Sequence, residues 1–375
     1  MKKALIVLLL LAFVAGGLFA QLSFGGYVNA GIGMFKGPNN DDVTFGLLSN
    51  NAWNANRMRA QLQGSYTSEE GNVGWRFRLR AQGTNMNAPF FHYINGWITG
   101  FDGVIKVYGG WLSNTELCGV DYMYGDDLLW EPGVVAVIQP IDLFSFGFGA
   151  MSTKGLYPYN SGADENFWDG TSWEGRALTI WAAAKVAVPD MLDFVVQSNI
   201  GKDNFLLYLS TAVYAIPGVD LDVGALFYNL NDYSDNGEMN IFTHIGLGMI
   251  ENLGVDIFAT FGKAGDSDLA MAFGAGAAWM GLGNIVPRFD VAFGKGFAPY
   301  SFKWDSHFDA FSYDSDQTYI AITPSVQFRA RSNAYVEVGA VIGIDVGDAP
   351  AYTTIKPAAE TGVSFGAFVD FRLTF

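Results

Sequence analysis

Residues 72–82 read Asn-Val-Gly-Trp-Arg-Phe-Arg-Leu-Arg-Ala-Gln and alternate between two kinds of side chain. The odd-numbered positions from 73 to 81 are all apolar, whereas the even-numbered positions include Arg76, Arg78 and Arg80. A period of two residues is the pattern of a β-strand with one apolar and one polar face. Because the apolar face carries no charge, the stretch predicts a strand with one side in a hydrophobic environment.

The same alternation runs through nearly the whole chain after residue 20, and it is clear at 55–66, 219–228, 320–328 and 334–344. A soluble β-sandwich would alternate as well, but strands of about ten residues, repeated this uniformly, are typical of barrels that cross a bilayer. Such a sheet has to close, because lipid cannot satisfy the hydrogen bonds of an open edge. The pattern predicts an all-β fold, a transmembrane antiparallel up-and-down β-barrel formed by residues 21–375 as a single domain.

The alternation predicts 18 strands, and 16 remain an alternative because the two faces of residues 91–100 are hard to tell apart. The predicted strands are 22–34, 54–67, 72–83, 91–100, 104–112, 133–139, 143–152, 175–187, 192–199, 205–216, 219–230, 240–250, 255–263, 269–280, 285–294, 318–329, 334–345 and 363–375. Every second connection is short, and the others include the long stretches 35–53, 113–132, 153–174, 295–317 and 346–362. Short turns on one rim and long loops on the other are typical of an outer-membrane barrel, with the short turns in the periplasm.

The first 20 residues predict export from the cytoplasm. Lys2 and Lys3 precede an apolar run of residues 4–14, and Gly16, Gly17 and Ala20 are small residues that suit signal-peptide cleavage. We therefore expect residues 1–20 to be a cleaved signal peptide and the mature chain to lie in the outer membrane. The only cysteine, Cys118, is too far from this segment to serve as a lipoprotein processing site.

The composition argues against several classes of protein. Lys and Arg number 21 against 37 Asp and Glu, a net charge of −16, and so acidic a chain is not suited to bind nucleic acid. The three histidines, His92, His244 and His307, form no zinc-binding motif and stand beside no obvious nucleophile. Acidic pairs in the long connections lack the spacing of an EF-hand. The sequence therefore predicts no enzyme, no cofactor and no metal site.

The last 13 residues carry a family resemblance. Residues 363–375 alternate with apolar side chains at every odd position, and the chain stops at Phe375. This stretch resembles the terminal assembly signal of outer-membrane β-barrel proteins. Together with the strand count, it makes the chain similar to the bacterial porins of 16 to 18 strands. The sequence, rich in Gly, Phe and Asp, also resembles those of spirochaetal outer-membrane proteins. The resemblance implies that Phe365, Phe371 and Phe375 are read by the barrel-assembly machinery. It also implies periplasmic chaperones and membrane lipid as partners, and leaves a homotrimer or a monomer open.

The inner face of the predicted barrel carries a row of arginines, Arg57, Arg59, Arg76, Arg78 and Arg80. If the turn at 68–71 pairs its strands symmetrically, Gln63 faces Arg76, Gln61 faces Arg78, Arg59 faces Arg80 and Arg57 faces Gln82. Like charges this close would be costly in a dry core, so the row predicts water or an acidic partner inside the barrel.

Two groups of carboxylates complete the predicted pathway. In general porins the third long loop folds inward, and here the corresponding connection, 113–132, carries Glu116, Asp121, Asp126, Asp127 and Glu131. This loop facing the arginines would form a constriction with a transverse electric field. Asp193, Asp220, Asp222, Asp256, Asp290 and Glu337 follow the short turns and predict a girdle of carboxylates at the periplasmic mouth.

The function that these features predict is an outer-membrane porin-like channel for passive diffusion of small hydrophilic solutes. Three alternatives remain open: a structural barrel whose arginines pair with carboxylates in a plugged lumen, a surface adhesin that binds through its long loops, and a transporter of hydrophobic solutes that uses aromatic side chains inside the barrel.

Overall fold

The computed structural model describes residues 20–37, 43–48, 59–82, 90–112, 117, 129, 132–153, 177–201, 205–230, 237–296, 318–331, 333–346 and 362–375. The predicted signal peptide lies outside the described residues apart from Ala20, as does Arg57. In the ranges that the structure describes, no helix is long and apolar enough to span a membrane.

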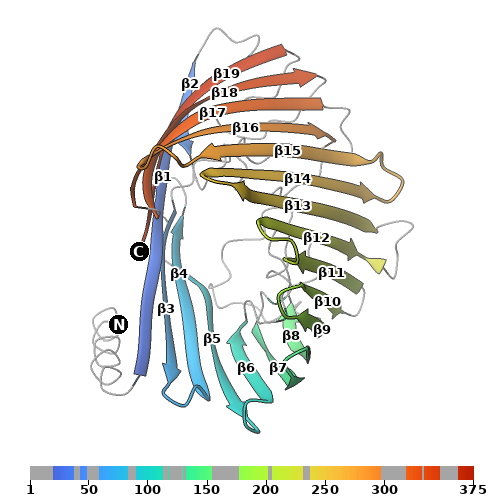
Figure 1. Cartoon of the computed structure of the whole chain (residues 1–375). Coiled ribbons are helices and arrows are strands. Elements are labelled where there is room, and N and C mark those ends of the chain that lie inside the picture. Colours follow the sequence, from blue (N-terminus) through green and yellow to red (C-terminus); the bar gives the residue numbers. More distant parts are fainter. Residues whose placement is uncertain are drawn as a thin grey trace.

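Within the described residues, all strands belong to one antiparallel sheet (Figure 1). Its strands are β1 (Ala20–Lys36), β2 (Thr44–Leu48), β3 (Arg59–Ser68), β4 (Val73–Gln82), β5 (Phe90–Gly100), β6 (Ile105–Trp111), β7 (Pro132–Ile141), β8 (Phe144–Thr153), β9 (Ala177–Val188), β10 (Leu192–Ile200), β11 (Phe205–Val213), β12 (Val219–Tyr228), β13 (Glu238–Ile250), β14 (Leu253–Ala264), β15 (Ala270–Trp279), β16 (Ile285–Lys295), β17 (Thr318–Arg331), β18 (Ala334–Val346) and β19 (Gly362–Thr374).

The sheet closes because β1 pairs on one edge with β19, from Tyr27 opposite Thr374 to Lys36 opposite Phe365. On its other edge β1 pairs first with β3 and then, from Gly31 to Phe35, with β2. β2 and β3 therefore share one place in the ring, and the barrel has 18 strand positions. This confirms the all-β barrel and the strand count that alternation predicts.

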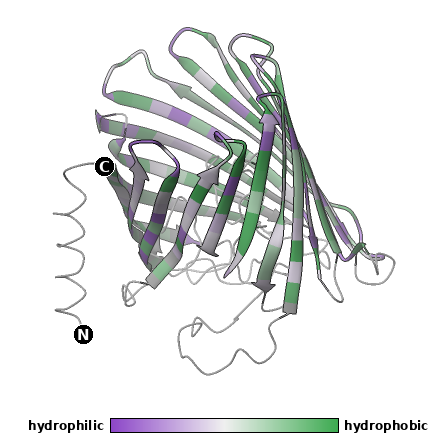
Figure 2. Cartoon of the chain, turned by 90° about the horizontal axis from the view of Figure 1, so that it is seen from below, coloured by the Kyte–Doolittle hydropathy of each residue, from purple (hydrophilic) through white to green (hydrophobic). Residues whose placement is uncertain are grey.

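Hydrophobic and hydrophilic residues alternate along the strands (Figure 2), and this alternation gives the two faces of the wall different side chains, as the sequence predicts. Large apolar side chains such as Ile98, Phe289 and Phe365 are exposed on the outside, where a bilayer would cover them. Polar side chains such as Gln197 and Thr323 are buried on the inside. The strands thus form a hydrophobic outer surface around a polar interior.

Short turns join alternate strands at one rim, as predicted. In the turn after β3 the Gly71 N–H donates to the Ser68 carbonyl oxygen over 2.9 Å, and Gly71 has a φ of +72°, which glycine adopts at little cost. In the turn after β9 the Met191 N–H bonds the Val188 oxygen at 3.0 Å. The backbone of Phe375 bonds Gly26 in both directions at 2.8 and 2.9 Å, so both chain ends of the barrel lie toward this rim.

The predicted register between β3 and β4 is wrong by two residues: each residue of β3 pairs with a residue two positions later in β4 than predicted. Gln63 pairs with Arg78, Gln61 with Arg80 and Arg59 with Gln82. The reason is that Ser68 ends β3 instead of starting the turn: its Oγ accepts from the Val73 N–H at 3.2 Å and donates to Asn72 Oδ1 at 3.0 Å. The shift amounts to two residues in the pairing, so each side chain keeps its predicted face.

Candidate solute pathway

Arginines of β4 form a basic wall on the inner face, and neutral groups hold their side chains. Arg80 donates from Nε and Nη2 to Gln61 Oε1 at 3.3 and 3.2 Å. Arg76 Nε donates to Asn95 Oδ1 at 3.1 Å, and the guanidinium of Arg78 lies 4.7 Å from the ring centre of Tyr93. These contacts, all to neutral groups, orient the guanidinium groups toward the interior.

The basic wall continues onto β5 and β6. Asn95, which orients Arg76, donates its own Nδ2 to the carbonyl oxygen of Trp111 at 2.9 Å. Lys106 Nζ lies 5.2 Å from the ring centre of Trp97 and 4.9 Å from that of Tyr108, so aromatic faces support this cation as well. Arg59 is in β3 opposite Gln82, and Arg57 is outside the described residues.

An apolar cluster lies beside the basic wall, on the inner face of β6–β9. Its buried members are Tyr108, Leu112, Leu117, Leu129, Val135, Val137, Met151, Trp181 and Ala183. Leu117 and Leu129 belong to the long connection between β6 and β7, and both are 0% exposed. This connection therefore contacts the inside of the barrel at two points, where apolar burial anchors it.

Gly147 makes room for this anchor. A Cβ built on Gly147 would lie 2.7 Å from two ring atoms of Trp181 and 2.8 Å from Leu117 Cδ1. The predicted constriction residues Glu116, Asp121, Asp126 and Asp127 lie outside the described residues, so their position relative to the arginines stays a prediction.

The six predicted carboxylates lie on β10–β18, and the structure shows how their wall is ordered. Asp220, Gly246, Asp256, Gly276 and Asp290 are successive register partners across β12–β16, so three carboxylates alternate with two glycines in one row. Asp193 pairs with Lys185 at 2.6 Å, and Asp290 pairs with Arg288 at 3.4 Å. Glu337 accepts from Gln327 Nε2 at 2.9 Å.

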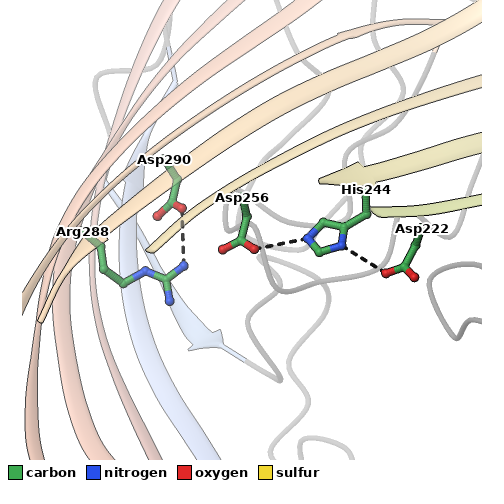
Figure 3. A network of polar contacts seen from close by, with 5 residues as sticks. All are labelled: Asp222, His244, Asp256, Arg288 and Asp290. Atoms are coloured by element: carbon green, nitrogen blue, oxygen red, sulfur yellow. Dashed lines mark hydrogen bonds and ion pairs between the residues drawn. The ribbon is translucent and has the colours of Figure 1, made fainter. Parts of the chain in front are cut away.

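His244 of β13 lies between two of these carboxylates (Figure 3). Its Nδ1 is 3.3 Å from Asp222 Oδ2, and its Nε2 is 3.2 Å from Asp256 Oδ1. The His244 side chain is only 7% exposed, whereas Asp256 is more open to the interior. The three residues form a continuous bridge across β12, β13 and β14.

Tyr214, in the turn after β11, extends this polar region to the rim. Burial raises the pKa of its phenol to about 12, together with a hydrogen bond to Asp193 and the negative charges of Asp193 and Asp222. The phenol therefore keeps its proton to a higher pH than an ordinary tyrosine, and it can donate to Asp193.

Solved structures share this architecture, although no known family model and no curated protein matches the sequence. OpdO of Pseudomonas aeruginosa aligns with a TM-score of 0.55 at 10% identity, over 95% of this chain and 97% of its own. OpdQ of the same organism aligns at 0.54 and 8% identity, over 95% and 99%. The outer membrane protein opdK, also from Pseudomonas aeruginosa, aligns at 0.52 and 8% identity, over 94% and 99%. The chain shares their fold. The resemblance to large outer-membrane barrels is confirmed at this level.

Two features of the interior escaped the sequence reasoning. His244 has apolar sequence neighbours, and its partners are 22 residues before it and 12 residues after it, so only the strand pairing brings them together.

The apolar cluster did leave a signal, because residues 134–138 and 180–184 are apolar at almost every position and lose the alternation found elsewhere. Loss of alternation within a barrel strand indicates an inner face that is covered by protein.

Proposed function

We propose that this chain is an outer-membrane channel through which small hydrophilic solutes diffuse passively. The observation that carries the proposal is the placement of charge: Arg76, Arg78, Arg80 and Lys106 point to the interior, as do the carboxylates of β10–β18, while the outer face is apolar. Charges that face the inside of a barrel are costly unless water or paired charges surround them. A barrel with an aqueous interior, set in a membrane, accounts for both the inward-facing charges and the apolar outer face.

The arrangement of the two walls supports a filter for charge. β4–β6 carry the basic side chains, and β12–β16 carry the row of carboxylates on the far side of the ring (Figure 1). Opposite charges on facing walls produce a field across the lumen, which acts on the charge and dipole of a passing solute. The acidic residues of the 113–132 connection would strengthen this field if the anchored loop brings them over the arginines.

The site of action that we propose is the outer membrane, reached with a cleaved signal peptide of residues 1–20. The terminal strand, with Phe365, Phe371 and Phe375 exposed on the outer face, suits recognition by the barrel-assembly machinery after transport by periplasmic chaperones. Assembly as a homotrimer belongs to the same proposal.

The experiment is a planar-bilayer recording of the mature chain refolded in detergent. We expect stepwise ion conductance and, under a salt gradient, a zero-current potential that shifts toward cation preference in Arg78→Ala. The matched control is Lys263→Ala, which removes one positive charge from an exposed position near the end of β14, at the rim opposite the short turns. Absence of conductance in correctly folded protein would refute the channel, and equal shifts in both variants would refute the role of the basic wall.

A plugged barrel is the second candidate, and the burial of the interior favours it. Glu337 is 1% exposed and Asp290 is 3% exposed, although both face inward, and the apolar cluster covers the inner face of β6–β9. Side chains this inaccessible indicate that protein fills part of the interior. If it fills the whole cross-section, the folded barrel will not conduct, and the same recording separates the two functions.

A further inference from the structure

The two carboxylates that contact His244, from Asp222 and Asp256, favour a positive charge on its imidazole. A neutral imidazole has one N–H group and can donate to only one carboxylate, whereas an imidazolium can donate from both nitrogens. Both nitrogens of His244 lie within 3.3 Å of a carboxylate oxygen, and the two carboxylates come from opposite neighbouring strands. The geometry therefore satisfies both carboxylate contacts when His244 is positively charged.

The surroundings of the bridge are acidic on both sides. On β12, Asp220 lies beside Asp222, and a Cβ built on Gly246 would be 3.6 Å from Asp220 Oδ2 and 3.7 Å from Asp256 Oδ1. Three carboxylates thus converge on the inner face around one imidazole. Two cations of the same wall have carboxylate partners of their own: Lys185 pairs with Asp193, and Arg288 pairs with Asp290 (Figure 3).

Titratable groups face His244 from both neighbouring strands. β12 contributes Asp220 and Asp222, and β14 contributes Asp256. Beyond them lie Tyr214 and Asp193 at the rim, and the Arg288–Asp290 pair on β16. On β13 itself, Glu238 is at the opposite end of the strand from the short turn.

We propose that His244 is a specificity-determining residue of the channel, which limits the cation preference of the carboxylate wall while protonated and releases it when the proton is lost. This inference rests on the proposed channel function. With the proton, the group of three carboxylates and one imidazolium has a net charge of −2; without it the charge is −3, and one of Asp222 and Asp256 faces a ring lone pair. Added negative charge on a pore wall raises the local concentration of cations and lowers that of anions.

A purely structural role would look different. If the imidazolium served only to join β12, β13 and β14, then its replacement would lower the stability of the barrel and leave the ion selectivity of the surviving channels unchanged. If His244 sets selectivity, a variant that cannot be protonated behaves like the alkaline form of the native protein at every pH.

The test measures the zero-current potential of single channels under a potassium chloride gradient, from mildly acidic to alkaline solution. The native channel should shift toward cation preference as the pH rises. His244→Gln should show the shifted value throughout, and His244→Lys, which keeps a positive charge, should stay at the acidic value. Lys263→Gln is the matched control, since it also removes one positive charge but from an exposed position at the loop end of β14.

The outcomes separate the inference from the function on which it rests. A folded native barrel that does not conduct would refute the channel itself. A conducting native channel whose selectivity is independent of pH, or whose pH response persists in His244→Lys, would overturn the inference. The native titration needs no variant, so the inference stays testable even where His244→Gln does not fold.

Discussion

The ring of Phe242 lies over Gly224, its direct register partner on the neighbouring strand, and a methyl group built on Gly224 would overlap the ring. The same arrangement recurs where Phe258 covers Gly274, Phe368 covers Gly339 and Trp97 covers Gly74. An aromatic ring over a cross-strand glycine shields backbone that glycine leaves bare. The arrangement keeps these large rings against the wall and out of the centre of the barrel.

Gly224→Ala should destabilise the barrel, because the added methyl group forces the Phe242 ring off the strand. Overpacking of this kind costs about 1–3 kcal/mol. The measurement is the free energy of unfolding from urea titration in detergent micelles. Adding Phe242→Leu to Gly224→Ala should restore part of the loss, since the smaller side chain leaves room for the methyl group.

Gly248→Ala is the matched control, because Gly248 lies in β13 and a Cβ there meets nothing within 4 Å. Equal losses in the two alanine variants would mean that backbone effects, and not the contact with Phe242, set the cost.

These glycines mark a limit of sequence reasoning. Glycine is expected in tight turns, and Gly71 and Gly218 do occupy turns with positive φ. Gly224 and Gly274 lie within strands, and their reason for being glycine is the ring on the adjacent strand. A composition cannot reveal this, because the need for a missing side chain depends on which residue lies opposite.

The strands themselves were predictable, because an apolar exterior and a polar interior impose a period of two on each strand. That signal specifies the face of Arg78 without specifying its partner. Partners depend on where each turn begins, and Ser68 shows that one hydroxyl bonded to the Val73 N–H moves the pairing of β3 with β4 by two residues. The His244 bridge depends on two such pairings at once, so it lies beyond what periodicity can predict.

Leu117→Ser should release the long connection between β6 and β7 from the inner wall. The side chain is fully buried beside Trp181, and a hydroxyl group there loses apolar contacts and gains no partner in the apolar cluster. The barrel strands keep their pairing, so we expect the urea midpoint to change little while the open-channel current becomes larger and noisier.

Leu178→Ser gives the comparison for this variant, because Leu178 is on β9 but is exposed on the outer face. An unchanged current in Leu117→Ser would show that the anchored connection does not restrict the pathway. An increase of the same size in Leu178→Ser would show that the effect is unrelated to the inner cluster.

Phe375→Ala should reduce assembly in cells more than it reduces stability. The Phe375 side chain is exposed on the outer face, and the backbone bonds to Gly26 do not require the ring. We expect less folded barrel in the membrane fraction, but a urea midpoint close to the native value for protein refolded in detergent. A matching loss at Phe289→Ala, another exposed outer phenylalanine, would argue against a special role for the terminal residue.

The raised pKa of Tyr214 makes stability depend on alkaline pH in a defined window. Because the folded pKa of about 12 exceeds the ordinary value of 10.0, the stabilisation is complete below about pH 10 and is lost as the pH rises through 12. Tyr214→Phe has no group to ionise, so the difference in unfolding free energy between the native protein and this variant should be constant up to about pH 10 and then move in favour of the variant.

Asp193→Asn tests the cause of that shift. The exchange removes a neighbouring negative charge and weakens the acceptor of the phenol, while partial desolvation of the Tyr214 phenol remains. The pKa of Tyr214 should therefore fall toward 10 without reaching it. The pH window in which stability is lost should begin at the same pH as in the native protein and end at a lower pH. A window that ends at the same pH in both proteins would assign the shift to burial alone. A native protein whose stability does not diverge from Tyr214→Phe above pH 10 would show that the phenol is not held as the rim geometry indicates.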